Sequence, residues 1–358
     1  MYTTGRRDGT VKMGKGKWKQ AGAVLMATLL LLTQGGCGVF RDIVPRETDE
    51  PEGHARIQDN GELIIVGFSQ IGSESIWRTA NTASVERALT KEKGYFLISD
   101  NARQKQENQI KAIRSYISQR VDYIVFSPIT EDGWDTVLEE ARDAGIPVIL
   151  MDRMANVDES LYATRICTDV TKEGEKAARW LEGDLKEKNR LHDDINIVVL
   201  QGTLGSSSEL ERTAGFESIA AQHGNWHILD RQTGDFTTAK GKEVMEQFLK
   251  TYADIDVVVS QNDDMTFGAI EAIEEAGLTT GVGGDIIIIS FDAVRDALKL
   301  VQAGKINVDI ECNPEQGEYL DMVIQKLERG EPLEKVYMVE EMVFTQRNVS
   351  GYLESRTY

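Results

Sequence analysis

The fold is decided by the apolar run Leu63-Ile64-Ile65-Val66-Gly67-Phe68, which leads directly into Ser69-Gln70-Ile71-Gly72-Ser73-Glu74-Ser75-Ile76-Trp77-Arg78. An apolar strand that ends in a polar turn is typical of open α/β sheets, in which ligands bind beyond the carboxyl ends of the strands. This turn carries a carboxylate, a guanidinium and an indole. Such groups suit a polyhydroxylated ligand, because hydroxyls both donate and accept hydrogen bonds and aromatic rings cover C–H faces.

The same alternation of short apolar strands and amphipathic helical segments continues along the chain and is repeated from about Thr168. It predicts mainly parallel sheets covered by helices on both faces. We therefore expect an α/β protein with two doubly wound parallel-sheet domains. The expected strands are 63–68, 95–99, 123–126, 147–151, 195–200, 226–232, 257–260, 286–290 and 306–310, and the expected helices are 76–93, 105–119, 134–144, 173–185, 210–223, 238–251 and 266–276.

Polar residues follow many of these strands, in addition to the first turn. The alternative interpretation is local, since Asp263 or Asp264 also suits the N-cap of a helix before Met265. Similar chemistry at five strand ends favours one shared ligand cleft, with Trp77 and Phe236 as stacking rings. The residues concerned after the later strands are Asp152 with Arg153, Asn262 with Asp263 and Asp264, Asp292, and Glu311.

The N-terminal region predicts export. Basic residues precede an apolar stretch at 21–32, which is typical of a secretory signal peptide and too short for a lasting membrane span of about 20 residues. Gly35-Gly36-Cys37-Gly38 resembles a bacterial lipobox, although Gln34 stands where leucine is usual. We expect a lipoprotein signal peptide at 1–36, lipidation of Cys37, and a polar tether at 37–60. An uncleaved anchor and a secreted protein with a free thiol are the alternatives.

Charge and cysteine content restrict the partners. The net charge is −19, which disfavours nucleic acid and anionic lipid surfaces. Cys167 and Cys312 are too few for a disulfide framework and are expected to be buried thiols. The polar tail at 345–358 is expected to be disordered.

Enzymatic motifs are weak in this sequence. His223 and His227 lack the helical glutamate of a zinc protease motif, and the serines at 206–208 lack the nucleophile-elbow pattern. We expect no catalytic residue, metal or cofactor. A glycoside-processing enzyme remains an alternative, because Glu74 and Asp152 are a possible carboxylate pair whose separation the sequence does not give.

From Leu63 to Phe344 the chain resembles periplasmic binding proteins of the sugar class, and within that class it is most similar to the galactofuranose-binding proteins. The runs that carry the resemblance are 66–70, 72–75, 77–78, 105–112, 200–203, 234–237, 240–246 and 262–265. The first turn lacks the paired phenylalanines of ribose binders, and Glu311 stands where they usually have glutamine. The resemblance therefore disfavours ribose as the ligand.

This resemblance implies the type I periplasmic binding protein fold, with an N-terminal domain at 61–163 plus 312–338 and a C-terminal domain at 164–311 plus 339–350. It implies a monomeric, non-catalytic, extracytoplasmic receptor that is lipid-anchored or periplasmic. The receptor closes about a hinge on a galactofuranose-like or galactose-like monosaccharide and delivers it to an ABC permease and its ATPase. A co-receptor for a membrane histidine kinase, with the same binding residues, is the alternative output. The implied ligand residues are Ser73, Glu74, Trp77, Arg78, Asp152, Arg153, Arg212, Phe236, Asn262, Asp292 and Glu311.

Overall fold

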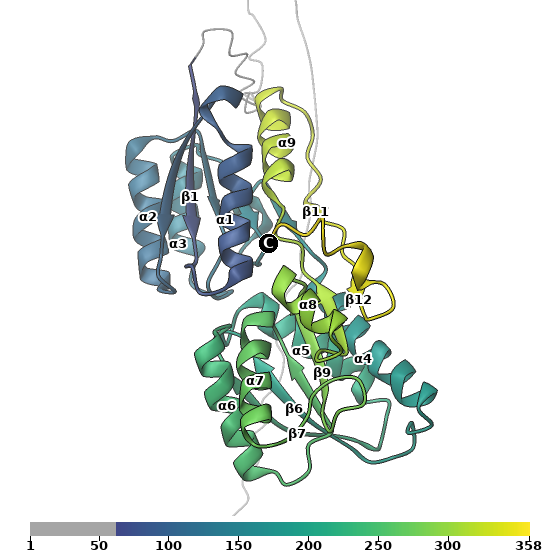
Figure 1. Ribbon diagram of the computed structural model, residues 1–358. Coiled ribbons are helices and arrows are strands. Elements are labelled where there is room, and N and C mark those ends of the chain that lie inside the picture. The colour runs from purple at the N-terminus through teal and green to yellow at the C-terminus, as the bar shows by residue number, and fades with distance from the viewer. Residues whose placement is uncertain (1–61) are drawn as a thin grey trace, which may run out of the picture. The chain divides into compact units, whose positions relative to one another are not determined.

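The computed structural model describes residues 62–358, and the predicted signal peptide, Cys37 and tether lie outside the described residues. Two six-stranded sheets organise this region, and we call each sheet with its helices a half (Figure 1). In the first half, the strands are β1 (Ile64–Gln70), β2 (Tyr95–Asn101), β3 (Tyr123–Phe126), β4 (Val148–Met151), β5 (Thr164–Cys167) and β11 (Val336–Met338), and the helices are α1 (Ile76–Ala88), α2 (Gln106–Gln119), α3 (Asp135–Asp143) and α9 (Gly317–Glu328).

In the second half, the strands are β6 (Ile195–Gln201), β7 (Trp226–Thr233), β8 (Val257–Ser260), β9 (Ile287–Asp292), β10 (Val308–Glu311) and β12 (Val343–Phe344). Its helices are α4 (Val170–Glu187), α5 (Ser207–Ala220), α6 (Thr238–Thr251), α7 (Asp263–Glu275) and α8 (Arg295–Gln302). These elements confirm the predicted pair of doubly wound α/β halves.

The strand order is β11-β5-β4-β3-β1-β2 in the first sheet and β12-β10-β9-β8-β6-β7 in the second. All pairings in the first sheet are parallel. In the second sheet β12 alone among the described strands is antiparallel, where it pairs with β10. The chain passes between the halves three times, after β5, after β10 and after β11.

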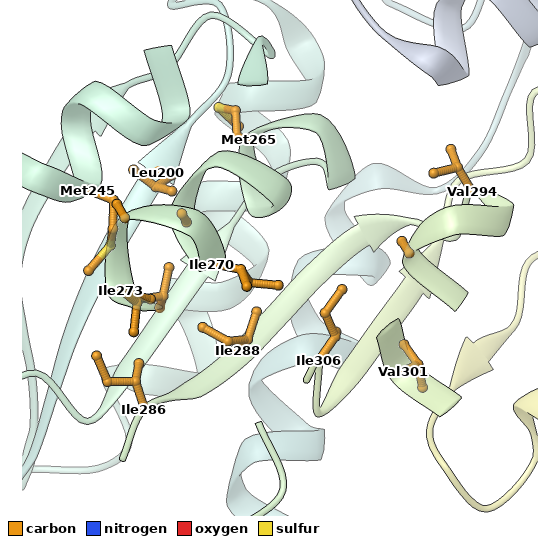
Figure 2. Packing of buried hydrophobic residues seen from close by; sticks show 14 of the residues in the cluster. Leu200, Met245, Met265, Ile270, Ile273, Ile286, Ile288, Val294, Val301 and Ile306 are labelled. Atoms are coloured by element: carbon orange, nitrogen blue, oxygen red, sulfur yellow. The ribbon is translucent and has the colours of Figure 1, made fainter. Parts of the chain in front are cut away.

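Helices cover both faces of each sheet, as the periodicity predicts. In the first half, Ile113 of α2 and Leu138 of α3 pack on one face, while Val85 of α1 and Leu320 of α9 pack on the other. In the second half, α4 and α5 bury one face. Figure 2 shows the opposite face, where residues of α6, α7 and α8 meet Leu200 of β6 and Ile288 of β9.

Several boundaries differ from the sequence-based expectation. β5 pairs with β4 and β11 in the first sheet, so this strand lies beyond the predicted domain boundary at residue 163. Helices α8 and α9 were not predicted, although each is an amphipathic segment that ends shortly before a glycine at positive φ, Gly304 and Gly330. Helix α7 begins at Asp263 rather than at Thr266.

The expectation of a disordered tail is wrong. Arg356 is buried and its Nη1 lies 2.6 Å from Oε1 of Glu311, while the rings of Phe344 and Tyr352 are 5.2 Å apart. The carboxylate of Glu311 thus gains a buried partner from the tail, which fixes a polar segment that has little apolar surface of its own. Between residues 62 and 358, no helix is both long enough and apolar enough to cross a membrane.

Candidate ligand-binding site

A cavity lies at the carboxyl ends of strands from both sheets, and the space free of protein atoms in it and at its mouth amounts to about 310 Å³. It is in the position that open α/β sheets use for ligands. Both halves contribute to its wall. The lining residues are Glu74, Ser75, Trp77, Arg78, Asp152, Arg153, Ser208, Arg212, Phe236, Asn262, Asp292 and Cys312.

Arg78 is held between two carboxylates in the first half. Its Nε lies 3.2 Å from Oε1 of Glu74, and its Nη1 lies 2.9 Å from Oδ2 of Asp152. Burial alone lowers the pKa of Arg78, but the two carboxylates outweigh burial and the net pKa is raised. This guanidinium is therefore a fixed cation in the wall.

Arg153 is a second buried guanidinium with fewer partners. Its Nη1 donates to the carbonyl oxygen of Ile129 at 3.0 Å, and its guanidinium lies 5.2 Å from the ring centroid of Phe236. Burial, followed by repulsion from Arg78, lowers the pKa of Arg153 to about 10. Its charge is thus less well compensated than that of Arg78, which favours a ligand that supplies hydrogen-bond acceptors.

Arg212 is the corresponding cation of the second half. Its Nε lies 2.7 Å from Oε2 of Glu173, its Nη2 lies 3.4 Å from Oδ1 of Asp292, and its Nη1 donates to the carbonyl oxygen of Gln261. Burial lowers the pKa of Arg212, but the charges of Glu173 and Asp292 raise it by a larger amount, so the net pKa is raised. Burial raises the pKa of Asp292 well above its usual range despite Arg212.

Two aromatic rings are fixed on the cavity wall. The indole Nε1 of Trp77 donates to the carbonyl oxygen of Cys312 at 2.6 Å. Phe236 lies against Gly202, where an added Cβ would be 1.8 Å from the ring Cζ atom. Nδ2 of Asn262 donates to the carbonyl oxygen of Phe236 at 3.2 Å. Both rings are therefore positioned by other residues before any ligand binds.

Backbone strain is concentrated at the same site. Asp152, Phe236 and Asp292 have positive φ angles of 64°, 59° and 105°. Non-glycine residues adopt this region rarely, and such conformations cluster at functional sites. These backbone conformations direct the three side chains, which lie at or just after strand ends, toward the cavity.

Two polar atoms of the wall are buried without a hydrogen-bond partner among the described residues: Oε2 of Glu74 and Nε of Arg153. Burying an unpartnered polar group is unfavourable, and most such groups in native proteins are hydrogen-bonded. The first is an acceptor and the second is a donor. The cavity therefore suits a ligand that supplies both functions at once.

Nine of the eleven residues proposed from the sequence line this cavity. Ser73 lies outside it and accepts a hydrogen bond from Nδ2 of Asn101 at 2.9 Å. Glu311 also lies outside it, since its carboxylate binds Arg356 and accepts from the amide of Met342 at 2.8 Å. The nine residues are Glu74, Trp77, Arg78, Asp152, Arg153, Arg212, Phe236, Asn262 and Asp292.

Sequence reasoning missed Ser75, Ser208 and Cys312 as lining residues. Ser75 is the N-cap of α1, and Ser208 lies in the first turn of α5. Cys312 is buried and free, as is Cys167, which confirms the prediction of two buried thiols. Ser75 stands next to Glu74 in the turn after β1, which was its sequence signal, whereas Ser208 and Cys312 come after β6 and β10, which carry no other lining residue.

A cluster of two carboxyl groups and a thiol includes Glu173, the partner of Arg212. Carboxyl oxygens of Glu173 and Glu341 and the Sγ of Cys312 lie within 4.8 Å of one another. Both oxygens of Glu173 are already occupied, by Thr168 and by Arg212. Burial, and then the charge of Glu173, raises the pKa of Glu341 to about 10. Glu173 and Glu341 therefore form a buried acid pair in which Glu341 holds a proton at neutral pH.

The model of the periplasmic binding protein domain matches residues 66–332. The chain belongs to the periplasmic binding protein family. Its two-sheet architecture is the type I fold of that family, as the sequence predicts. Over 298 residues it is 40% identical to the galactofuranose-binding protein YtfQ of Escherichia coli strain K12, with 82% of this chain and 91% of that protein covered.

Solved structures of similar proteins agree with this assignment. A protein from Mycobacterium smegmatis in complex with β-D-fucofuranose is 42% identical, with a TM-score of 0.78, and the match covers 82% of this chain and 95% of that one. The binding protein of the arabinose ABC transporter from Shewanella sp. ANA-3, bound to α- and β-L-arabinofuranose, is 42% identical with a TM-score of 0.77 and the same coverage, 82% and 95%. The match to this periplasmic binding protein therefore extends over nearly the whole length of each relative.

Proposed function

We propose that this periplasmic binding protein binds a monosaccharide in its furanose form, of the galactofuranose type, in the cavity between the two halves. The observation that supports this proposal most directly is that two buried atoms of the described cavity wall, Oε2 of Glu74 and Nε of Arg153, have no hydrogen-bond partner. The same wall also holds two aromatic rings. A sugar hydroxyl donates to the first atom, and a hydroxyl or ring oxygen accepts from the second. Trp77 and Phe236 cover the C–H faces of the ring.

The relatives support a furanose ligand. Proteins with 40 to 42% identity are named for galactofuranose or hold fucofuranose or arabinofuranose. The ribose import binding protein of Bacillus subtilis is less similar, at 31% identity over 65% of this chain. This gradient favours a furanose of the galactose or arabinose series over ribose.

Closure about a hinge gives the binding mechanism. Arg78 and Arg153 belong to the first half, whereas Arg212 and Asp292 belong to the second, so a ligand in the cavity contacts both. Such a ligand stabilises the closed form by contacts that an open form lacks. The three chain crossings are the places where the backbone rotates.

We further propose that the protein is an extracytoplasmic monomer, lipid-anchored through Cys37, with two sugar-binding domains. In this proposal it delivers the sugar to an ABC permease and its ATPase and is not an enzyme. The support is the lipobox-like sequence and the Shewanella relative, which is a component of an arabinose ABC transporter. Lipidation is tested by mass spectrometry of the mature N-terminus in wild type and in Cys37→Ser.

The binding proposal is tested by calorimetric titration of the full chain with galactose, arabinose, ribose, glucose and a galactofuranose-enriched preparation. We expect binding of galactose or arabinose at micromolar concentration or tighter, with affinity that rises with the furanose fraction. Arg114→Ala, which changes an exposed guanidinium paired with Glu140, is the control and leaves binding unchanged. No heat with any of these sugars overturns the ligand assignment, and turnover of a nitrophenyl glycoside overturns the non-catalytic one.

A further inference from the structure

Three consecutive polar residues, Asn262, Asp263 and Asp264, follow β8, and each has a different partner. Oδ1 of Asn262 accepts from the amide of Met265 at 2.9 Å and thereby caps α7. Asp263 accepts from Ser290 at 2.5 Å and from the amide of Val294 at 2.8 Å, both within the second half. Asp264 is needed for neither task, so the capping role considered from the sequence belongs to Asn262.

Asp264 instead reaches the first half. Its Oδ2 accepts a hydrogen bond from the backbone amide of Ile76 at 3.1 Å, between residues that are 188 positions apart. The side chain is buried, with 7% of its surface exposed. Ile76 is the first residue of α1, so the carboxylate of one half meets the N-terminus of a helix in the other.

Helix α1 has a free place for this carboxylate. The first amides of a helix lack partners within it, and its N-terminus carries a partial positive charge. Ser75 satisfies the amide of Arg78 at 3.0 Å, and within the described helix the first turn holds no Asp or Glu. Asp264 supplies the acceptor and the negative charge from outside the helix.

We propose that Asp264 is a positioning residue that latches the second half to the N-terminus of α1 and so holds the ligand-contacting residues of the first half in place when the protein is closed. Glu74 and the N-cap Ser75 precede Ile76, and Trp77 and Arg78 follow it, so the latch acts on four cavity residues although Asp264 does not line the cavity. The consequence for ligand affinity rests on the proposed function.

Two further hydrogen bonds join the halves nearby. The amide of Met154 donates to Oγ of Ser207 at 2.9 Å, and the amide of Glu131 donates to the carbonyl oxygen of Gly205 at 2.9 Å. These bonds join α5 and the turn before it to segments that follow β3 and β4, whereas the latch joins α7 to α1. The two halves are thus joined through two different sets of segments.

The latch works against an electrostatic cost. Burial raises the pKa of Asp264, the hydrogen bond from Ile76 lowers it, and the charge of Glu74 raises it by a smaller amount, so that the net pKa is about 6. At neutral pH the carboxylate is mainly ionised and depends on the amide of Ile76 for compensation. A change that removes the acceptor therefore affects closure more than one that only removes the charge.

The test compares Asp264→Ala with Asp264→Asn in the full chain. The asparagine variant keeps an oxygen that accepts from Ile76, so it separates the hydrogen bond from the charge. The matched control is Glu271→Ala, on the exposed face of the same helix, where Glu271 pairs with Lys242. Thermal melting of each variant checks that it is folded.

The first readout requires no sugar. Hydrogen exchange of peptides that contain the Ile76 and Met154 amides is expected to be about tenfold faster in Asp264→Ala and unchanged in Asp264→Asn and Glu271→Ala. The second readout is the dissociation rate of the bound sugar, expected to rise about ten- to a hundredfold in Asp264→Ala alone, since a hydrogen bond to a charged group is lost.

The two readouts separate this proposal from the sugar assignment. If the wild type binds none of the sugars but exchange changes as expected, the latch stands and the ligand assignment fails. The latch is overturned if Asp264→Ala exchanges like the wild type. It is also overturned if only the Ile76 peptide changes while sugar dissociation does not, because Asp264 is then merely a local cap.

Discussion

Arg78 and Asp152 form a buried ion pair, with 2.9 Å between Nη1 and Oδ2, that joins the segments after β1 and β4. Glu74 binds the same guanidinium through Nε. Arg153 is adjacent, but its Nε lies 4.0 Å from Oδ2 of Asp152. The two carboxylates are thus directed mainly at Arg78, which leaves Arg153 as the cation of the first half that is available to a ligand.

We therefore expect Arg153→Ala to abolish sugar binding without unfolding the protein. The expected loss of binding free energy is about 2 to 5 kcal/mol, because a ligand group desolvated in the cavity loses its charged partner. The melting temperature is expected to change little, since Arg153 is a buried charge with incomplete compensation. Calorimetry and thermal melting measure the two effects, with Arg114→Ala as the control. Near wild-type affinity in this variant contradicts the site assignment.

Arg212→Ala is expected to lower stability as well as binding. Arg212 compensates two buried carboxylates, Glu173 and Asp292, and breaking a buried pair by removing one partner costs about 3 to 5 kcal/mol. Urea unfolding, followed by circular dichroism, measures this loss against Arg153→Ala. Equal unfolding free energies for the two variants argue against the distinct roles that we assign to the two guanidiniums.

The sequence predicted the fold and most of the residues that line the cavity, because both depend on local patterns. Apolar runs of strand length, followed by polar turns, located the cavity wall at Arg78, Arg153 and Asp292. Glu311 is the last residue of β10, yet its carboxylate binds Arg356 of the C-terminal tail. A contact between residues 45 positions apart leaves no periodic signal in the sequence.

The missed elements have a similar cause. β5 is a four-residue strand that contains Arg165, so its pattern does not stand out as apolar. It becomes a strand through pairing with β4 and β11 on either side. The latch at Asp264 likewise depends on how the two halves meet, whereas the sequence alone allowed only a local cap.

Gly202→Ala is expected to weaken binding by displacing Phe236. A Cβ at position 202 would lie 1.8 Å from Cζ and 2.2 Å from Cε2 of that ring, so the ring must move from its place on the cavity wall. Overpacking of this kind costs about 1 to 3 kcal/mol. Titration with the sugar measures the loss of affinity.

The matched control is Gly183→Ala in α4, where a Cβ would meet no atom of residues 62–358 within 4 Å. This variant is expected to bind normally and to melt slightly higher, since alanine favours a helix interior over glycine. If both variants bind alike, the ring of Phe236 does not contact the ligand.

Glu341→Gln is expected to remove a dependence of stability on pH. The pKa of Glu341 is raised to about 10, first by burial and then by Glu173, from an ordinary value of 4.5. The folded protein therefore keeps a proton that the unfolded chain releases above about pH 4.5, and folding stability falls as the pH rises toward 10. The slope from one such group is at most about 1.4 kcal/mol per pH unit.

Glutamine imitates the protonated form, because its amide donates to Glu173 and its oxygen accepts from Nζ of Lys176, which lies 3.1 Å from Glu341 in the wild type. The variant should thus be more stable than the wild type at pH 8 to 9 and show a flatter profile in urea unfolding. Burial also raises the pKa of Asp309 to about 8 and that of Asp292 well above its usual range, and both add slopes of the same sign in wild type and variant alike. The contribution of Glu341 is therefore the difference between the two profiles. A wild-type profile that is already flat between pH 6 and 9, or an unchanged slope in Glu341→Gln, means that Glu341 does not hold a proton beside Glu173.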